Sequence, residues 1–294
     1  MDFLSKNLPY LLAGISVGGQ YALIAIGYTM VYGILRLINF AHGDIFMVAG
    51  LVMIYSTTVL PLYISIPLTI VVTVILGVAI EKVAYRPLRN APRMSVMISA
   101  IGVSYLLQNL ALYITGGLAQ VYPTIPFISN TVTIGSATTK VVTILTPILM
   151  IILVVVLIQL INHTKIGMAM RSVSTDFETS RLMGINVNRV ISMTFAIGSF
   201  LAAIGSILYF SNYPSVIPTS GGMPGLKAFV AAVFGGIGSI PGAVIGAMLI
   251  GIVENLIKGA GWTTFSDAFT FVLLIVVLLF KPTGLFGEAA TDKV

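Results

Sequence analysis

The stretch TILTPILMIILVVVLIQLI, residues 143–161, contains no charged side chain. An apolar run of ~18 residues or more is long enough to cross a bilayer as a helix. A second such run, TFSDAFTFVLLIVVLLF, occupies residues 264–280 and contains one charge. Strands of a membrane barrel would instead alternate apolar and polar residues over ~10 positions. Because backbone groups in lipid must be satisfied internally, the sequence predicts an all-α, polytopic transmembrane helical bundle.

The whole composition agrees with these two runs, since 57% of the residues are hydrophobic and only 8% are charged. We expect about eight spans, at residues 8–34, 45–60, 66–84, 94–115, 143–161, 190–212, 226–257 and 264–280. The seventh contains GGIGSIPG (235–242), where glycine and proline should bend or break a helix. It is therefore either one long tilted span or a broken or re-entrant helix. Eight simple spans leave both termini outside, and one hairpin would reverse the C-terminus.

Basic residues are concentrated in two of the predicted loops. One loop, after the third span, contains Lys82, Arg86, Arg89 and Arg93, and the other contains Lys165, Arg171, Arg181 and Arg189. The positive-inside rule places both loops in the cytoplasm and the loops 116–142 and 212–226 outside. The net charge of +6 is thus a signal of topology rather than of nucleic-acid binding. The chain has no cysteine, which excludes disulfides and thiolate metal sites.

The segment RSVSTDFETSRLMGINVNRV, residues 171–190, is a polar island between apolar runs. Its pattern predicts a short helix that begins near Asp176, with Ser174 or Thr175 as the cap and Gly184 as the terminator. Val173, Phe177, Leu182 and Ile185 provide its apolar contacts. Such an element is either an ordinary interfacial helix or a docking element that transmits force from a soluble partner.

Within this island, Glu178 and Gly184 resemble the E-A-A-x-x-x-G signature of ABC importer permeases, although Thr179 and Ser180 replace its two alanines. The continuation RLMGIN (181–186) is similar to the branched-chain amino acid branch of that family. Three further stretches resemble its LivH-type permeases: GYTMVYGILRLINFAHGDIFMVAG (27–50), AAVFGGIGSIPGAVIGA (231–247) and KPTGLFG (281–287).

The resemblance implies a single transmembrane permease domain over residues 1–294, with a cytoplasmic coupling segment at 163–190. The residues that it assigns to coupling with an ATPase are Asp176, Glu178, Arg181, Leu182, Gly184, Ile185 and Asn186. The implied partners are a homologous second permease (LivM type), two ATP-binding subunits (LivG and LivF type) and a periplasmic branched-chain amino acid binding protein. ATP-Mg would be bound by those subunits, with no cofactor in this chain, and the location would be a bacterial inner membrane.

Asn39, His42, Gly43 and Asp44 lie between the first two apolar runs. Their polar groups suit either a translocation path or a hydrogen-bonded turn, in which Asp44 caps the next helix. One histidine and one aspartate supply too few ligands for a metal site.

Glu254 and Lys258 are four residues apart, so they share one helix face and can pair. They suit either a gate or subunit contact, or a cytoplasmic interface at which Lys258 reaches outward. Asp267 also lies near the end of a span, where an interfacial position is expected.

We expect no enzyme, because the chain has neither a P-loop lysine nor a catalytic constellation. GGIGSIPG has the glycines of a P-loop without the lysine. Two alternatives to an ABC permease are an ion-coupled secondary transporter and an uncoupled channel for small polar solutes. The former usually needs ionisable residues near the bilayer midplane, and the latter a filter loop or a charged ring.

Overall fold

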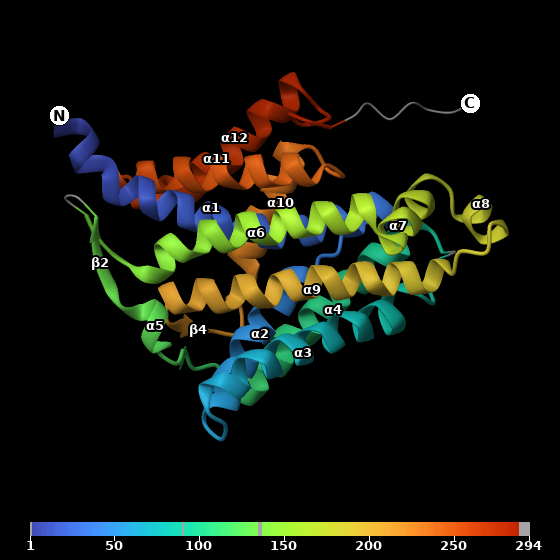
Figure 1. Cartoon of the computed structure of the whole chain (residues 1–294), viewed down its shortest axis with the longest axis horizontal. Helices are drawn as coiled ribbons and strands as arrows, with labels where there is room; N and C mark the ends of the chain where they lie inside the picture. The colour runs from blue at the N-terminus through green and yellow to red at the C-terminus, as the bar shows by residue number, and fades with distance from the viewer. Residues whose placement is uncertain (1, 90, 135–136, 288–294) are drawn as a thin grey trace.

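The computed structural model describes residues 2–89, 91–134 and 137–287 as an elongated bundle of helices (Figure 1). Among these residues, seven helical segments are long and apolar enough to span a membrane. These segments correspond to α1 (Asp2–Leu35), α3 (Leu62–Ile80), α4 (Arg93–Thr115), α6 (Val141–His163), α9 (Val187–Asn212), α11 (Ile240–Gly259) and α12 (Ser266–Phe280). Two apolar helices are shorter, α2 (His42–Thr57) and α10 (Gly222–Gly235). The predicted all-α membrane bundle is confirmed.

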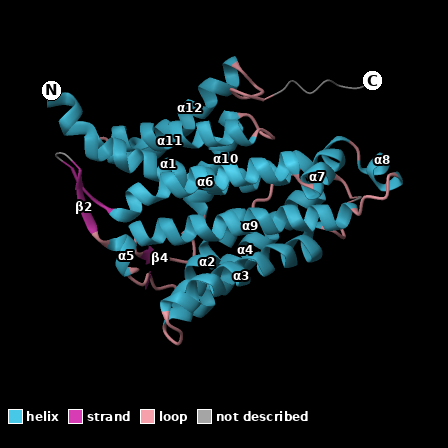
Figure 2. Ribbon diagram, viewed as in Figure 1, coloured by secondary structure: helices cyan, strands magenta, loops and turns pink. Residues whose placement is uncertain are grey.

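The two ends of the bundle are different (Figures 1 and 2). One end, called the hairpin end below, has the antiparallel strands β2 (Thr131–Ile134) and β3 (Ala137–Lys140) and the short helix α5 (Pro126–Ser129). The other, the α8 end, has α7 (Lys165–Thr175) and α8 (Phe177–Leu182). Strands β1 (Gln120–Val121) and β4 (Ser215–Val216) pair near the hairpin end and tie two connecting segments together.

Of the eight predicted spans, the one at 45–60 differs from the structure, whereas for the one at 226–257 the broken-helix alternative is confirmed. The span predicted at 45–60 is α2, which has 16 residues and is shorter than one crossing needs. The span predicted at 226–257 is divided by a turn in which Gly236 and Gly238 have φ of 105° and 102°. Positive φ is accessible to glycine without strain, so the chain reverses there. Helices α10 and α11 are thus an antiparallel pair, with Gly246 packed against the carbonyl group of Ala231.

The order of helices repeats along the chain. A long helix, a short one and two candidate spans follow each other as α1–α4 and again as α9–α12, where the last span consists of the 3-10 turn at Thr263–Phe265 and α12. The second helix of each set is joined to the third by a short turn, at residues 58–61 and 236–239. Helix α9 packs on α1, α2 and α3, while α1 packs on α9, α10 and α11. Because α1 begins at the hairpin end and α9 at the α8 end (Figure 1), the two sets run in opposite directions. Such inverted repeats are typical of membrane transporters.

Helices α2 and α10 both begin inside the bundle, and their first turns touch each other. Gly43 lies against Gly221 and Gly225, and a Cβ atom on Gly43 would be 2.5 Å from the carbonyl oxygen of Gly221. The ring of His42, which is buried, stands against Gly27 and Gly198 of the long helices. Non-helical backbone at membrane depth is stable only where protein surrounds it, and these glycine contacts provide that cover.

We predict that Gly43→Ala destabilises the bundle by roughly 1–3 kcal/mol, because the added methyl group has no space between two backbones. Gly102→Ala is the matched control, since no atom lies within 4 Å of the Cβ position in α4. The melting temperature of each purified variant in detergent measures the effect. An unchanged melting temperature for Gly43→Ala would contradict the close contact between α2 and α10.

Candidate functional site

The predicted coupling segment forms a protrusion at the α8 end. Asp176 itself caps α8, because its carboxylate accepts hydrogen bonds from the backbone N–H of Glu178 at 2.8 Å and of Thr179 at 3.3 Å. The prediction that Ser174 or Thr175 is the cap is therefore wrong, since both hydroxyl groups donate back to the carbonyl group of Arg171 within α7. Serine and threonine hydroxyl groups in helices often bond to the carbonyl group three or four residues earlier, and a hydroxyl group used in this way does not cap the next helix.

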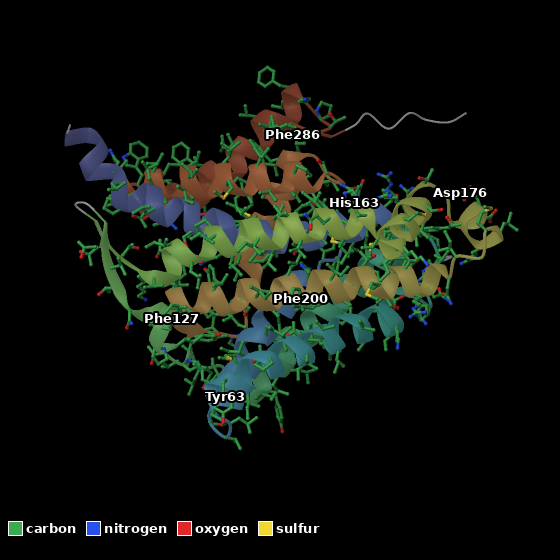
Figure 3. All side chains as sticks on the ribbon, in the orientation of Figure 1. Tyr63, Phe127, His163, Asp176, Phe200 and Phe286 are labelled. Carbon is green, nitrogen blue, oxygen red and sulfur yellow. The ribbon has the colours of Figure 1, made fainter. Side chains whose placement is uncertain are left out.

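The predicted end of this helix is confirmed. Gly184 follows α8 with φ of 83°, the left-handed conformation that glycine adopts at helix ends. Asn186 then caps α9 by accepting the backbone N–H of Arg189 at 3.1 Å. The segment thus has a capping side chain at both junctions, with Asp176 between α7 and α8 (Figure 3) and Asn186 directly before α9.

One face of the segment is anchored and the other is exposed. Phe177 and Ile185 pack against the core, and the hydroxyl groups of Ser172 and Ser180 lie 2.8 Å apart across the two short helices. On the outer side Leu182 is 87% exposed and Met183 is 77% exposed. Glu178 and Arg181 are also exposed. The outer side of the protrusion therefore has two uncovered apolar side chains next to exposed charges.

A buried ionic cluster that was not predicted from the sequence, called the Glu81 joint below, lies beside this segment and contains Glu81, Arg86, Arg89 and Ser192. Glu81 is fully buried in the π-helical turn η1 (Glu81–Tyr85) that continues α3. Its carboxylate pairs with Arg86 at 3.1 Å and Arg89 at 2.9 Å, and accepts the hydroxyl group of Ser192 at 2.6 Å. Burial lowers the pKa of the Arg89 guanidinium, and the charge of Glu81 opposes that shift.

This joint links the end of α3 to the first turns of α9, since Arg89 also donates to Asn188. The α8 protrusion leads directly into the same turns. The basic residues Arg86 and Arg89 were assigned only to topology from the sequence. The sequence did contain a signal for this pairing, because Glu81 lies five residues before Arg86 and eight residues before Arg89.

The polar residues predicted between the first two apolar runs, Asn39, His42 and Asp44, are buried within the bundle. Asn39 accepts a hydrogen bond from the Tyr85 hydroxyl group at 2.8 Å. Asp44 accepts bonds from Ser104 at 2.5 Å and Gln108 at 3.0 Å in α4. Asp44 therefore does not cap α2, which begins at His42 without a side-chain cap, but ties α2 to α4. The amide nitrogen of Asn39 has no hydrogen-bond partner.

Glu254 belongs to a second buried ionic cluster. Its carboxylate pairs with Lys258 at 2.5 Å, as the spacing predicts, and with Lys227 at 2.8 Å. It also accepts the hydroxyl group of Tyr21 at 3.2 Å, while Lys227 reaches Asp267 at 2.6 Å. Lys227 was missed because it is one charge within the apolar helix α10 and meets its partners only through folding.

This second cluster lies toward the hairpin end, beside a cavity of about 310 Å³. Lys258 precedes Gly259, which packs against Tyr10 near the start of α1. The positive-inside rule puts the α8 end in the cytoplasm, and Glu254 and Lys258 lie toward the other end. The prediction of a cytoplasmic interface for these two residues is therefore wrong. The turn between α10 and α11 reverses the chain and brings both residues to the opposite end. Burial raises the pKa of Tyr213, at the cavity's edge, with the charge of Glu254 as the second cause.

Among the residues that the structure describes, no three His, Asp or Glu side chains gather closely enough to hold a metal ion. The site residues are thus of two kinds, a protruding segment with an exposed apolar tip and buried hydrogen-bonded or ion-paired clusters.

A family model described as "Branched-chain amino acid transport system / permease component" matches residues 10–278. The chain is similar to the high-affinity branched-chain amino acid transport system permease protein BraD of Pseudomonas aeruginosa, at 39% identity over the full length of both. It is 39% identical to LivH of Escherichia coli K12, covering 98% of this chain and 97% of LivH. It is 26% identical to the ribose import permease RbsC of Haemophilus influenzae, with coverages of 94% and 85%.

A solved structure also resembles the chain. It is an inward-facing conformation assigned to the metal-chelate type of ABC transporter, with a TM-score of 0.51. The alignment covers 93% of this chain and 85% of that chain at 15% identity. At this identity the likeness shows a shared fold.

We predict that Glu81→Ala lowers the stability of the purified chain by about 3–5 kcal/mol, because it leaves Arg86 and Arg89 without their buried partner. Glu178→Ala, which removes an exposed acid at the same end, should leave the melting temperature unchanged. Thermal unfolding in detergent compares the two. Equal melting temperatures would show that the Glu81 joint does not hold α3 and α9 together.

Proposed function

Because the chain belongs to the branched-chain amino acid transport permease family, we propose that it is the membrane-spanning subunit of an ATP-driven importer for leucine, isoleucine and valine. Its relatives BraD and LivH are described as high-affinity branched-chain amino acid permeases and match it over almost their whole length. The protruding α8, with its exposed Leu182 and Met183, is the observation that carries the ATP-driven part of this proposal. It gives a separate subunit an anchored place to bind.

The proposed complex has the composition that the family resemblance implies. This chain, as one transmembrane domain, forms half of the translocation path with a homologous second permease. Two ATP-binding subunits hold ATP-Mg, and a periplasmic binding protein delivers the amino acid. The positive-inside rule places the α8 end in the cytoplasm, since Arg86, Arg89, Arg171 and Arg189 lie there. The complex would then lie in the inner membrane of a bacterium, with the hairpin end facing the periplasm.

The coupling mechanism follows from the contacts of segment 163–190. A docked ATPase that moves α8 also moves the start of α9, because Ile185 and Asn186 connect the two directly. The Glu81 joint carries the same displacement to α3 through Ser192 and Arg89. Helices α3 and α9 enclose α2, whose first turn contains His42 and Gly43. Asn39, His42, Gly43 and Glu254 are the residues that we assign to the path or its gate.

One observation favours an ion-coupled secondary transporter as a second candidate. Glu254 is buried and pairs with the buried Lys227 inside the helical bundle. Intramembrane ionisable groups are often parts of ion or proton pathways. A secondary transporter would leave the exposed tip of α8 without a role, and the ABC permease is therefore preferred.

We predict that the double variant Leu182→Glu, Met183→Glu weakens ATPase binding by at least about tenfold, because central apolar contacts dominate such interfaces. The ATP-binding subunit that co-purifies from native membranes in mild detergent measures this. Val121→Glu is the matched control, since Val121 is exposed at the hairpin end. Co-purification of a P-loop ATPase in equal amounts with all three chains would contradict docking at α8, and its absence from the wild type would contradict the ABC proposal itself.

A further inference from the structure

The cavity near the hairpin end is bounded by α1, α9, α10, α11 and α12, together with the 3-10 turn η2 (Thr263–Phe265). Its volume of about 310 Å³ is at the lower limit of the range in which proteins bind small molecules. The cavity is far from the α8 protrusion, since Lys258 and Asp267 lie where α11 ends and α12 begins. Its role is therefore separate from docking of the ATPase.

Four charges line this cavity in alternating order. Asp267 pairs with Lys227, Lys227 with Glu254, and Glu254 with Lys258. The inner pair, Lys227 and Glu254, is buried, whereas the side chains of the outer two residues, Lys258 and Asp267, are 32% and 46% exposed. An acid at one end of the row and a base at the other match a ligand with two opposite charges, whereas a site for a simple ion would have an excess of one sign.

The rest of the cavity lining is mixed, with apolar and tyrosine side chains beside the hydroxyl groups of Thr263 and Ser266. Val17, Met223 and Pro224 supply apolar surface, and the rings of Tyr209 and Tyr213 lie 5.0 Å apart at its edge. Replacing a buried ion pair with apolar residues is often neutral for stability or stabilising. The buried pair Lys227–Glu254 is therefore not explained by stability alone. A row of charges that ends in an acid and a base, beside the apolar part of the lining, suits a zwitterion that carries an aliphatic side chain.

We propose that this cavity is a weak binding site for a zwitterionic, apolar amino acid. The ligand's ammonium group pairs with Asp267 and its carboxylate with Lys258, while its side chain lies against Met223 and Val17. Glu254 keeps Lys227 and the Tyr21 hydroxyl group as partners when Lys258 turns to the ligand. Because the ligand must compete for that contact, the site is weak, and tight binding remains with the binding protein. This inference rests on the proposed function for the identity of the substrate.

A cysteine reporter tests the site directly, because the chain contains no cysteine of its own. Met223 is 43% exposed, so Met223→Cys in the purified complex without binding protein should react with a water-soluble maleimide. Millimolar leucine should slow that reaction. 4-Methylpentanoate, which lacks the ammonium group, and 3-methylbutylamine, which lacks the carboxylate, should not slow it. Val121→Cys, exposed at the hairpin end outside the cavity, should react at the same rate with and without leucine.

Asp267→Asn and Lys258→Gln, each in the Met223→Cys chain, should lose the protection by leucine. Both variants leave Lys227 paired with Glu254, so the fold is expected to survive. Protection by either leucine analogue alone, unchanged protection in both variants, or a cysteine that never reacts would overturn the site.

The same samples show whether a negative result concerns the cavity site or the proposed function. A complex that retains its ATPase but shows no protection by any amino acid overturns the cavity site alone. Protection by another zwitterionic amino acid, with none by leucine, keeps the site and overturns the proposed substrate.

Discussion

The close approach of two glycine backbones at the centre of the bundle is the contact on which the rest of the fold depends. Helices α2 and α10 can begin inside the bundle only because Gly43 and Gly221 touch without side chains between them. The linkers before these helices carry backbone groups that lipid could not satisfy, so α1 and α9 must cover them. This arrangement puts polar residues such as Asn39 and His42 at depth while the lipid-facing helices stay apolar.

Two buried acids then hold the helices at opposite ends of the bundle. At the α8 end Glu81 joins the continuation of α3 to α9 through Arg86, Arg89 and Ser192. Toward the hairpin end Glu254 joins α11 to α1 and, through Lys227, to α10 and α12. A conformational change that separates helices at either end must exchange these charge partners. A movement of α8 would meet the Glu81 cluster first, since Ser192 and Arg89 connect it to the start of α9.

Much of the architecture could be predicted because hydropathy is a local property. The long apolar runs, the break at GGIGSIPG and the helix ending at Gly184 all follow from residues close together in the chain. The ionic clusters could not be predicted, since Glu81 meets Ser192 and Lys227 meets Glu254 only after folding. The same reason explains why Asp44 was expected to cap α2, whereas its partners Ser104 and Gln108 lie on α4. Local capping rules cannot anticipate a distant donor.

Uptake of labelled leucine tests most directly whether ATP drives transport. The complete complex, reconstituted in vesicles with its binding protein, should accumulate leucine when ATP is supplied to the ATPase side. Without ATP, an imposed proton or sodium gradient should produce no accumulation. Accumulation driven by the gradient alone would contradict an ATP-driven permease and would make the buried Lys227–Glu254 cluster the first place to look for ion coupling.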